Sequence, residues 1–157
     1  MSQEVVEASA ARLHLALKGR NERVGCAESL TGGELAAWLS STPGASTTFT
    51  GAVVSYASEV KRQVLGVTAE RVVSSECAEQ MATGVRKLLG ADVVVSATGV
   101  GGPDPSEGKP AGTVFVAVVR GDDVAVEELA LDGDPEEVLA GTVSRCLGLL
   151  EQMLRTD

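Results

Sequence analysis

The sequence contains few aromatic residues and few basic ones. Phe, Trp and Tyr together make up 3% of the 157 residues, and 13 Lys and Arg stand against 22 Asp and Glu. Nucleic-acid-binding proteins usually present a basic face, and those that bind single strands stack bases on aromatic side chains. The net charge of −9 therefore argues against a nucleic-acid partner, although a local basic patch remains compatible with this average.

Cysteine and histidine are also scarce. Cys26, Cys77 and Cys146 are far apart and form no CxxC pair, so the sequence shows neither a disulfide framework nor a zinc-binding pattern. A Ser-His-Asp triad would have to use His14, the one histidine in the chain. His14 lies within a helical pattern that offers no obvious partners, which favours an ordinary structural role.

Long hydrophobic runs are missing as well. Apolar residues make up 44% of the chain, but no run approaches the roughly 20 residues that a membrane-spanning helix needs. The N-terminal sequence MSQEVVEASA has acidic residues where a secretory signal has basic ones. We therefore expect a soluble cytoplasmic protein with no membrane partner.

Apolar periodicity predicts the order of the secondary structure within a single domain, residues 1–157. Ser74 or Ser75 and Asp134 are expected helix N-caps, and the last two strands are expected to form a hairpin. This order predicts an α/β fold in which a mixed sheet has helices on both faces. The predicted helices cover residues 3–18, 32–41, 59–65, 75–89 and 135–154, and the predicted strands cover residues 23–27, 49–56, 91–98, 113–119 and 124–131.

Three unusual stretches each follow a predicted strand. They are ESLTGG at residues 28–33, YASEVK at residues 56–61 and TGVGGP at residues 98–103. If helices connect parallel strands, all three stretches lie at the carboxyl edge of the sheet, where open α/β sheets bind ligands.

The first stretch has two interpretations. Ser29 is a common type of helix N-cap, and Gly32 and Gly33 could simply let a strand and a helix pack closely. Alternatively, backbone N–H groups at the start of a helix hold an anion or an oxyanion, and the glycines let a ligand approach the backbone.

Lys61 in the second stretch is either a solvated surface lysine or a base. Burial at a sheet edge lowers the pKa of a lysine, and a neutral lysine can take the proton from a serine hydroxyl. Tyr56, the one tyrosine, either packs at the strand end or orients such a Ser-Lys dyad and stacks on a flat substrate.

The third stretch opens an irregular segment over residues 99–112. It lacks the GK[ST] ending of a Walker loop and opens no helix, so it fits neither nucleotide-binding fingerprint. It is either a flexible surface loop or functional, and fourteen irregular residues inside one domain favour function.

Taken together, these motifs resemble one family. The sequences AESLTGG, PGAS, YASEVK followed by LGV, and ATGVGGP with KPAGTV occur in the order typical of the CinA C-terminal-domain family, the nicotinamide-nucleotide amidases. The resemblance runs from about Val5 to Leu154. It implies a three-layer α/β/α sandwich with a mixed, mostly parallel sheet. Longer members carry an additional N-terminal domain, and the chain resembles the stand-alone form.

The resemblance also implies an activity, which is hydrolysis of nicotinamide mononucleotide to nicotinic acid mononucleotide and ammonia without a metal or other cofactor. Ser29 matches the nucleophile in the family's ES-x-TGG motif. Lys61 and Tyr56 match the lysine and tyrosine of its Y-x-x-E-x-K motif. The family further suggests a homo-oligomer, a dimer or larger.

The expected substrate-binding residues come from the same motifs. N–H groups near Leu30 to Gly33 are expected to stabilise the oxyanion, Glu28 to face the cationic pyridinium ring, and the Gly99 to Gly102 loop to bind the phosphate. The full expected set is Glu28, Leu30, Thr31, Gly32, Gly33, Ser46, Thr98, Gly99, Gly101 and Gly102.

The sequence departs from the family pattern at three places. Ser58 replaces an Asn, residues 71–75 read RVVSS where GAVSE is usual, and residues 104–108 read DPSEG where a glycine-rich stretch is usual. The first two could alter substrate contacts. Two alternatives to the amidase therefore remain: a nucleotide- or partner-binding module without turnover, and an amidase for another small amide.

Overall fold

The computed structural model, in which residues 2–156 are described, has one five-stranded sheet with the strand order β2-β1-β3-β4-β5. β2, β1 and β3 are parallel, and β4 pairs antiparallel with both β3 and β5. The strands are β1 Val24–Glu28, β2 Phe49–Val54, β3 Val93–Gly99, β4 Thr113–Arg120 and β5 Asp123–Ala130.

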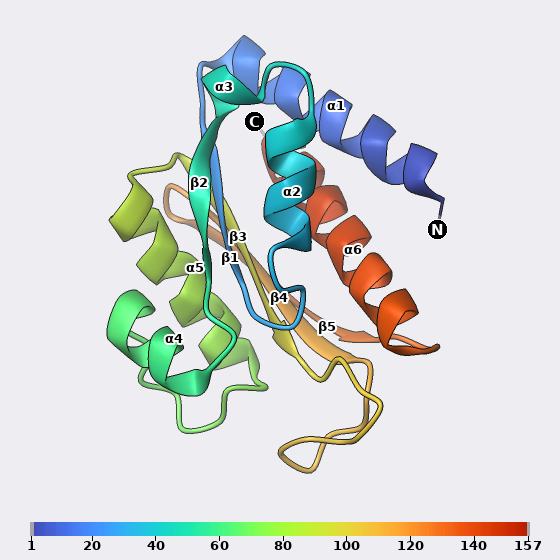
Figure 1. The fold of residues 1–157 in the computed structure, drawn as a ribbon. Coiled ribbons are helices and arrows are strands. Elements are labelled where there is room, and N and C mark those ends of the chain that lie inside the picture. Colours follow the sequence, from blue (N-terminus) through green and yellow to red (C-terminus); the bar gives the residue numbers. More distant parts are fainter. Residues whose placement is uncertain (1, 157) are drawn as a thin grey trace.

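Helices cover both faces of this sheet, which confirms the expected three-layer α/β/α fold with a mixed sheet (Figure 1). α1, α2 and α6 pack on one face, and α4 and α5 pack on the other. The helices are α1 Gln3–Arg20, α2 Glu34–Ser41, α3 Ala45–Thr48, α4 Ser58–Leu65, α5 Ser75–Leu89 and α6 Pro135–Arg155.

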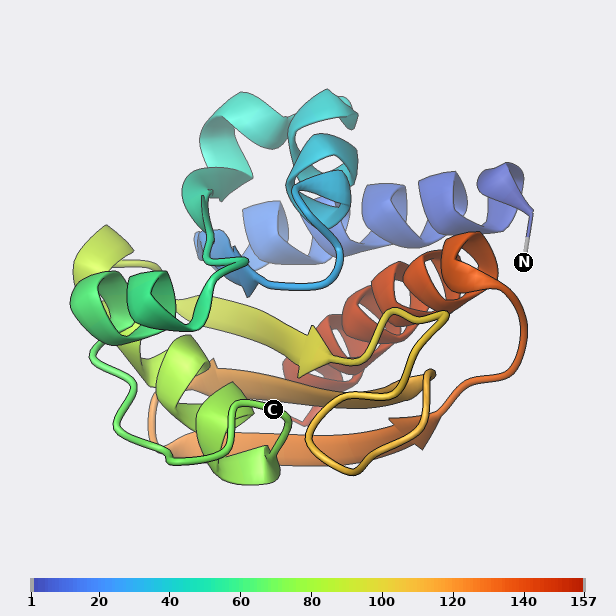
Figure 2. The same ribbon diagram turned by 60° about the horizontal axis from the view of Figure 1, so that its bottom comes forward.

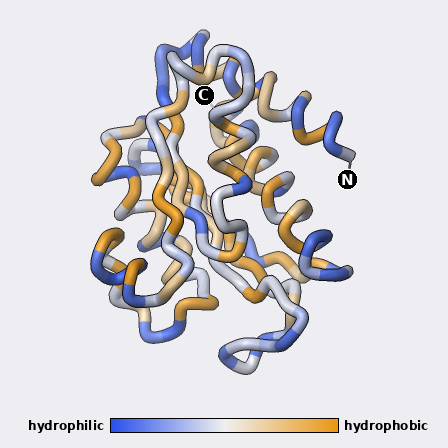
Figure 3. Tube along the Cα trace, in the orientation of Figure 1, coloured by the Kyte–Doolittle hydropathy of each residue, from blue (hydrophilic) through white to orange (hydrophobic). Residues whose placement is uncertain are grey.

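The sequence of β3 explains how one strand serves both cores. Side chains alternate between the two faces of a strand, so Val93 and Val95 join the core under α1 and α6 while Val94 joins the core under α5. Both faces are buried, which is why β3 reads as an almost continuous apolar run. Figure 3 shows this apolar centre, in contrast to the largely hydrophilic tip of the loop between β3 and β4.

Some predicted boundaries were wrong. α2 begins at Glu34 rather than at residue 32, because Gly32 and Gly33 have φ values of +59° and +109°, outside the helical region. β2 ends at Val54 rather than at residue 56. The short helix α3 was not predicted. The caps Ser74 and Asp134 are confirmed, since their side chains accept hydrogen bonds from backbone N–H groups in the first turns of α5 and α6.

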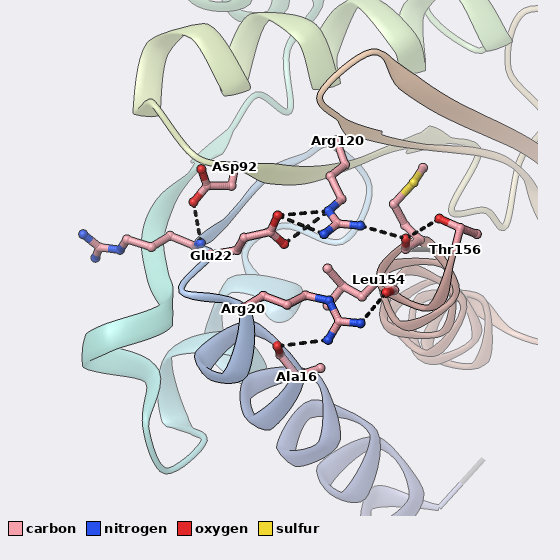
Figure 4. Close-up of polar contacts among 9 residues, drawn as sticks. Ala16, Arg20, Glu22, Asp92, Arg120, Leu154 and Thr156 are labelled. Atoms are coloured by element: carbon pink, nitrogen blue, oxygen red, sulfur yellow. Dashed lines mark hydrogen bonds and ion pairs between the residues drawn. The ribbon is translucent and has the colours of Figure 1, made fainter.

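Polar contacts fasten the C-terminal end of α6 to the rest of the fold (Figure 4). The Arg120 guanidinium donates to both carboxylate oxygens of Glu22 and to the carbonyl oxygen of Met153. The Arg20 guanidinium donates to the carbonyl oxygen of Leu154 over 2.7 Å. These arginines satisfy carbonyl groups that the end of a helix leaves unpaired.

α4 lies unusually close to α5 at Gly84. A Cβ atom at this position would come within 2.0 Å of the Leu65 carbonyl oxygen, so the two helices can approach this closely only because residue 84 is glycine. Leu65 is the last residue of α4, the helix that carries Lys61. Among residues 2–156, no helix is both long enough and apolar enough to cross a membrane.

Candidate active site

The three stretches that follow β1, β2 and β3 meet at one edge of the sheet, as predicted. β1 pairs in parallel with both neighbours, with Glu28 opposite Val54 and Ala97, and β3 extends two residues farther to Gly99, so all three strands end at the same edge. A cavity of about 430 Å³ opens at this edge. Figure 2 brings the edge forward and shows the loop between β3 and β4 projecting from it.

The cavity brings together most of the predicted site residues. Ser29 and Leu30 line it from the first stretch, and Tyr56 and Lys61 from the second. Thr98, Gly99, Gly101 and Gly102 line it from the third stretch.

Lys61 is buried although its side chain carries an amine. It is 1% exposed, and its Nζ donates to the carbonyl oxygens of Ser55 over 2.7 Å and of Tyr56 over 3.0 Å. Burial lowers the pKa of Lys61, and electrostatic interactions with Cys77 and Glu107 partly oppose this effect. At a given pH, a larger fraction of Lys61 is therefore in the neutral amine form than for a solvated lysine.

Two hydrogen bonds hold Ser55, the first of the two residues that bind Lys61. The N–H of Ser55 donates to the carbonyl oxygen of Glu28 over 2.7 Å, and the Ser55 hydroxyl donates to the same oxygen over 3.2 Å. Glu28 is the last residue of β1 and directly precedes Ser29. The turn that carries Ser29 and the carbonyl that binds Lys61 are thus fixed to each other.

The hydroxyl of Ser29 is not used as a helix cap. Instead, the buried carboxylate of Glu28 accepts hydrogen bonds from the N–H groups of Leu35 and Ala36, over 2.9 and 3.0 Å, at the start of α2. Ser29 is 7% exposed, and its hydroxyl has no hydrogen-bond partner among residues 2–156. The structure therefore leaves this hydroxyl available to the cavity.

The same contacts correct the expectation for Glu28. Its carboxylate neutralises the positive end of α2 and is completely buried, so it does not line the cavity and does not face a ring bound there. Asp104, in the loop after β3, is the carboxylate that lines the cavity.

The turn after Ser29 has several unpaired donors. The N–H of Gly32 donates to the Ser29 carbonyl, whereas those of Leu30, Thr31 and Gly33 make no hydrogen bond among the described residues. The Thr31 hydroxyl is buried and also lacks a partner in this part of the chain. Thr31, Gly32 and Gly33 belong to the turn but do not line the cavity.

Tyr56 and Thr98 differ from each other in exposure and in the hydrogen bonds that they make. Tyr56 lines the cavity and is 73% exposed, and its carbonyl oxygen accepts a hydrogen bond from Lys61. The Thr98 hydroxyl is buried and donates to the Val72 carbonyl over 2.7 Å. Gly99 is required by packing, since a Cβ there would lie 2.5 Å from the Thr113 carbonyl oxygen.

Ser46 lies at the opposite edge of the sheet, contrary to the expectation that it contacts substrate. It belongs to α3, which directly precedes β2 and therefore sits at the amino ends of the parallel strands. The six residues of β2 separate it from the cavity, a length of about 20 Å.

The sequence did not reveal several residues that shape the site. Cys77 is completely buried in the first turn of α5, with its thiol beside the Thr98 hydroxyl, and burial raises its pKa. Val72 and Val73 line the cavity, and Glu107 binds their N–H groups. Cys77 belongs to no motif, whereas Val72, Val73 and Glu107 lie in two of the stretches that depart from the family pattern. Two departures from the family pattern, at residues 71–75 and 104–108, contact each other through Arg71 and Glu107.

These features define an α/β/α protein with a serine and a buried lysine in one cavity at the carboxyl edge of its parallel strands. The family model of the CinA C-terminal domain matches residues 6–154, and the chain belongs to this family. Among residues 2–156, no group of three or more His, Cys, Asp or Glu side chains is placed to hold a metal ion.

Known relatives agree with this assignment. A competence-damage inducible protein of Geobacillus kaustophilus is 43% identical over 147 residues, which cover 90% of this chain and 36% of that protein. A CinA-like protein of Frankia casuarinae is 43% identical over 140 residues, 86% of this chain and 32% of that protein. The chain thus spans about a third of the length of the curated relatives it matches.

Solved structures share the fold over nearly the whole chain. A CinA superfamily protein from Klebsiella pneumoniae superposes with a TM-score of 0.92 and 35% identity, covering 96% of this chain and 98% of that one. A CinA superfamily protein from Escherichia coli has a TM-score of 0.92 and 31% identity, covering 98% of this chain and 93% of that one.

Proposed function

We propose that this chain is an amidase that hydrolyses nicotinamide mononucleotide to nicotinic acid mononucleotide and ammonia. The observation that carries the proposal is the presence of a buried lysine and an unengaged serine hydroxyl in one cavity. The reaction class follows from these two groups. The choice of a pyridine nucleotide rests on the resemblance of the surrounding motifs to the nicotinamide-nucleotide amidases.

The hydrogen bonds of Lys61 suit the role of a base. A neutral amine has two N–H groups and one lone pair, and the carbonyl oxygens of Ser55 and Tyr56 take both N–H groups. The lone pair is then left for a third partner in the cavity, and the Ser29 hydroxyl is the candidate. Burial favours this neutral state because it disfavours the ammonium ion.

The reaction follows in two halves. Lys61 accepts the proton of the Ser29 hydroxyl while Ser29 Oγ bonds to the carboxamide carbon, whose oxygen becomes an oxyanion. Of the donors expected in the turn at residues 30–33, the unpaired N–H of Leu30 belongs to a residue that lines the cavity, and it is the donor proposed for this oxyanion; one such donor typically contributes about 3 kcal/mol. The C–N bond then breaks, and ammonia leaves with the proton that Lys61 returns.

The second half regenerates the enzyme. Water loses a proton to Lys61 and attacks the nicotinoyl ester on Ser29, which releases the carboxylate and restores the serine hydroxyl. In this arrangement, Asp104 faces the cationic pyridinium ring and the loop from Gly99 to Gly102 binds the phosphate.

The proposal is tested by ammonia release from nicotinamide mononucleotide, without added metal, alongside thermal unfolding with the same nucleotide. We expect release of ammonia and an equal amount of nicotinic acid mononucleotide. Thermal stabilisation without ammonia release would identify a binding module instead. Release of ammonia from another small amide, but not from the nucleotide, would keep the Ser-Lys chemistry and reject the substrate.

A further inference from the structure

The loop between β3 and β4 is fastened to the segment that precedes α5. The Glu107 carboxylate accepts hydrogen bonds from the N–H groups of Val72 and Val73, over 3.2 and 2.6 Å. The Arg71 guanidinium also donates to the Glu107 carbonyl oxygen over 3.3 Å. One side chain therefore satisfies two successive backbone donors from a segment more than thirty residues away.

Both fastened segments are walls of the proposed active site. Val72 and Val73 line the cavity on one side, and Asp104 and Ser106 line it from the loop. Glu107 itself does not line the cavity. It can therefore affect a bound molecule only indirectly, through the residues that it holds and through the effect of its charge on the Lys61 pKa.

Both backbone polar groups of Val72 are hydrogen-bonded. Its N–H binds Glu107, and its carbonyl oxygen accepts a hydrogen bond from the Thr98 hydroxyl on β3 over 2.7 Å. Thr98 is fixed by the sheet, whereas Glu107 belongs to a loop that is itself closed by two hydrogen bonds between Ser106 and Lys109. Loss of the Glu107 carboxylate would leave the partly buried N–H groups of Val72 and Val73 unpaired. It would also free the loop from the segment that precedes α5.

We propose that Glu107 is a positioning residue that holds the two walls of the cavity together and thereby sets the affinity for the nucleotide. This role rests on the proposed amidase function. Glu107 makes no hydrogen bond or ion pair with Ser29 or Lys61, and loss of its charge would lower the Lys61 pKa further and keep the amine neutral. Its removal therefore weakens substrate binding and leaves the chemical step largely intact.

The test compares Glu107→Gln with Glu70→Gln. Glutamine keeps the length of the side chain and offers one carbonyl oxygen, but its amide group faces an N–H donor and cannot accept from it. Glu70 is exposed and its carboxylate has no hydrogen-bond or ion-pair partner among residues 2–156, so its variant controls for the loss of one charge. Glu107→Gly serves as a second variant, because residue 107 has a φ of +52° that glycine adopts without strain.

Two readouts separate this role from the proposed function. Amide hydrogen exchange of Val72 and Val73 reports the fastening without any substrate, with Val95 in β3 as the reference for an intact fold. We expect exchange at both amides to accelerate at least about tenfold in both Glu107 variants, with KM for the nucleotide raised about fivefold or more and kcat within about threefold. Glu70→Gln should match the wild type in both readouts.

Other results would overturn the proposal. Unchanged exchange at Val72 and Val73 would show that the carboxylate does not hold the wall. Faster exchange with an unchanged KM, or a fall in kcat alone, would show that the wall does not set the affinity. A wild-type protein that neither hydrolyses nor binds the nucleotide would instead reject the amidase function, and this role with it.

Discussion

The amine of Lys61 donates a hydrogen bond to the backbone carbonyl oxygen of Ser55 over 2.7 Å, and the lysine is only 1% exposed. Ser55 in turn is bound to the carbonyl oxygen of Glu28, the residue before Ser29. The base and the nucleophile of the proposed reaction are therefore positioned through backbone groups. None of the ion pairs among residues 2–156 includes Lys61, so a buried ammonium ion there would have no carboxylate in direct contact.

The lowered pKa of Lys61 predicts how stability depends on pH. Between the folded pKa and the unfolded value of about 10.4, the unfolded state binds more protons than the folded state, so the free energy of unfolding rises with pH. Lys61→Met removes this group and its pH dependence. Urea unfolding of both proteins between pH 7 and 10 should show the wild type gaining stability relative to the variant as the pH rises. A constant difference would mean that the pKa of Lys61 is not lowered.

Gly84 gives a prediction opposite to that of helix propensity. Alanine in a helix interior is normally favoured over glycine by about 1 kcal/mol. At residue 84, however, the Cβ would lie 2.0 Å from the Leu65 carbonyl oxygen, so Gly84→Ala must push α4 away from α5. We expect a loss of about 2 kcal/mol in unfolding free energy and a lower kcat, because α4 carries Lys61.

The matched control for this substitution is Gly19→Ala. Gly19 lies within α1, and a Cβ there would have no atom within 4 Å. Gly19→Ala should therefore be neutral or stabilising and should leave turnover unchanged. Equal effects of the two substitutions in chemical denaturation would contradict the close contact between α4 and α5.

We expect His14 to lower the stability of the protein in acid. Its ring is buried and binds Thr48 and, over 2.9 Å, the Leu39 carbonyl oxygen, and burial lowers its pKa below 6.5. Below pH 6.5 the unfolded state takes up a proton that the folded state does not, so stability falls as the pH decreases, by at most about 1.4 kcal/mol per pH unit.

Proton NMR of the single histidine measures this directly, with His14→Gln as the control. The ring should titrate below pH 6.5, and the variant should lose less stability between pH 6.5 and 5 than the wild type. A ring that titrates at or above 6.5 would argue against its burial in the neutral form.

The contact between Arg120 and Glu22 should stabilise the C-terminal end of α6. The side chains are only 13% and 21% exposed, and Arg120 also binds the Met153 carbonyl oxygen. Arg120→Ala leaves a partly buried carboxylate without this partner, so we expect a loss of about 2 kcal/mol by chemical denaturation. Arg155→Ala removes a 71% exposed arginine with a 3.9 Å ion pair and should cost less than about 0.5 kcal/mol.

Local sequence signals predicted the fold well. Asp134 and Ser74 were recognisable as caps because a cap needs only the next few backbone N–H groups. The three motifs were expected at one sheet edge because strand direction follows from the helical connections. The role of Glu28 was missed, since a carboxylate beside a serine gives no sign that it turns towards the start of the next helix.

Contacts between segments that are distant in the sequence could not be predicted from local signals. Ser46 belongs to a motif of the family, yet the direction of β2 places it at the far edge of the sheet. Glu107 and Val73 are 34 residues apart, and no periodicity links them. The tight approach of Gly84 to Leu65 likewise depends on how two helices pack, which neither helix shows alone.

The measurement that tests the central claim most directly is ammonia release from nicotinamide mononucleotide by the wild type, Ser29→Ala and Ser40→Ala. Ser40 is an exposed serine on α2 whose hydroxyl binds only its own helix, so its variant should retain full turnover. Ser29→Ala should lower kcat about a thousandfold or more while remaining folded. Near-normal turnover by a clean preparation of Ser29→Ala would show that Ser29 is not the nucleophile.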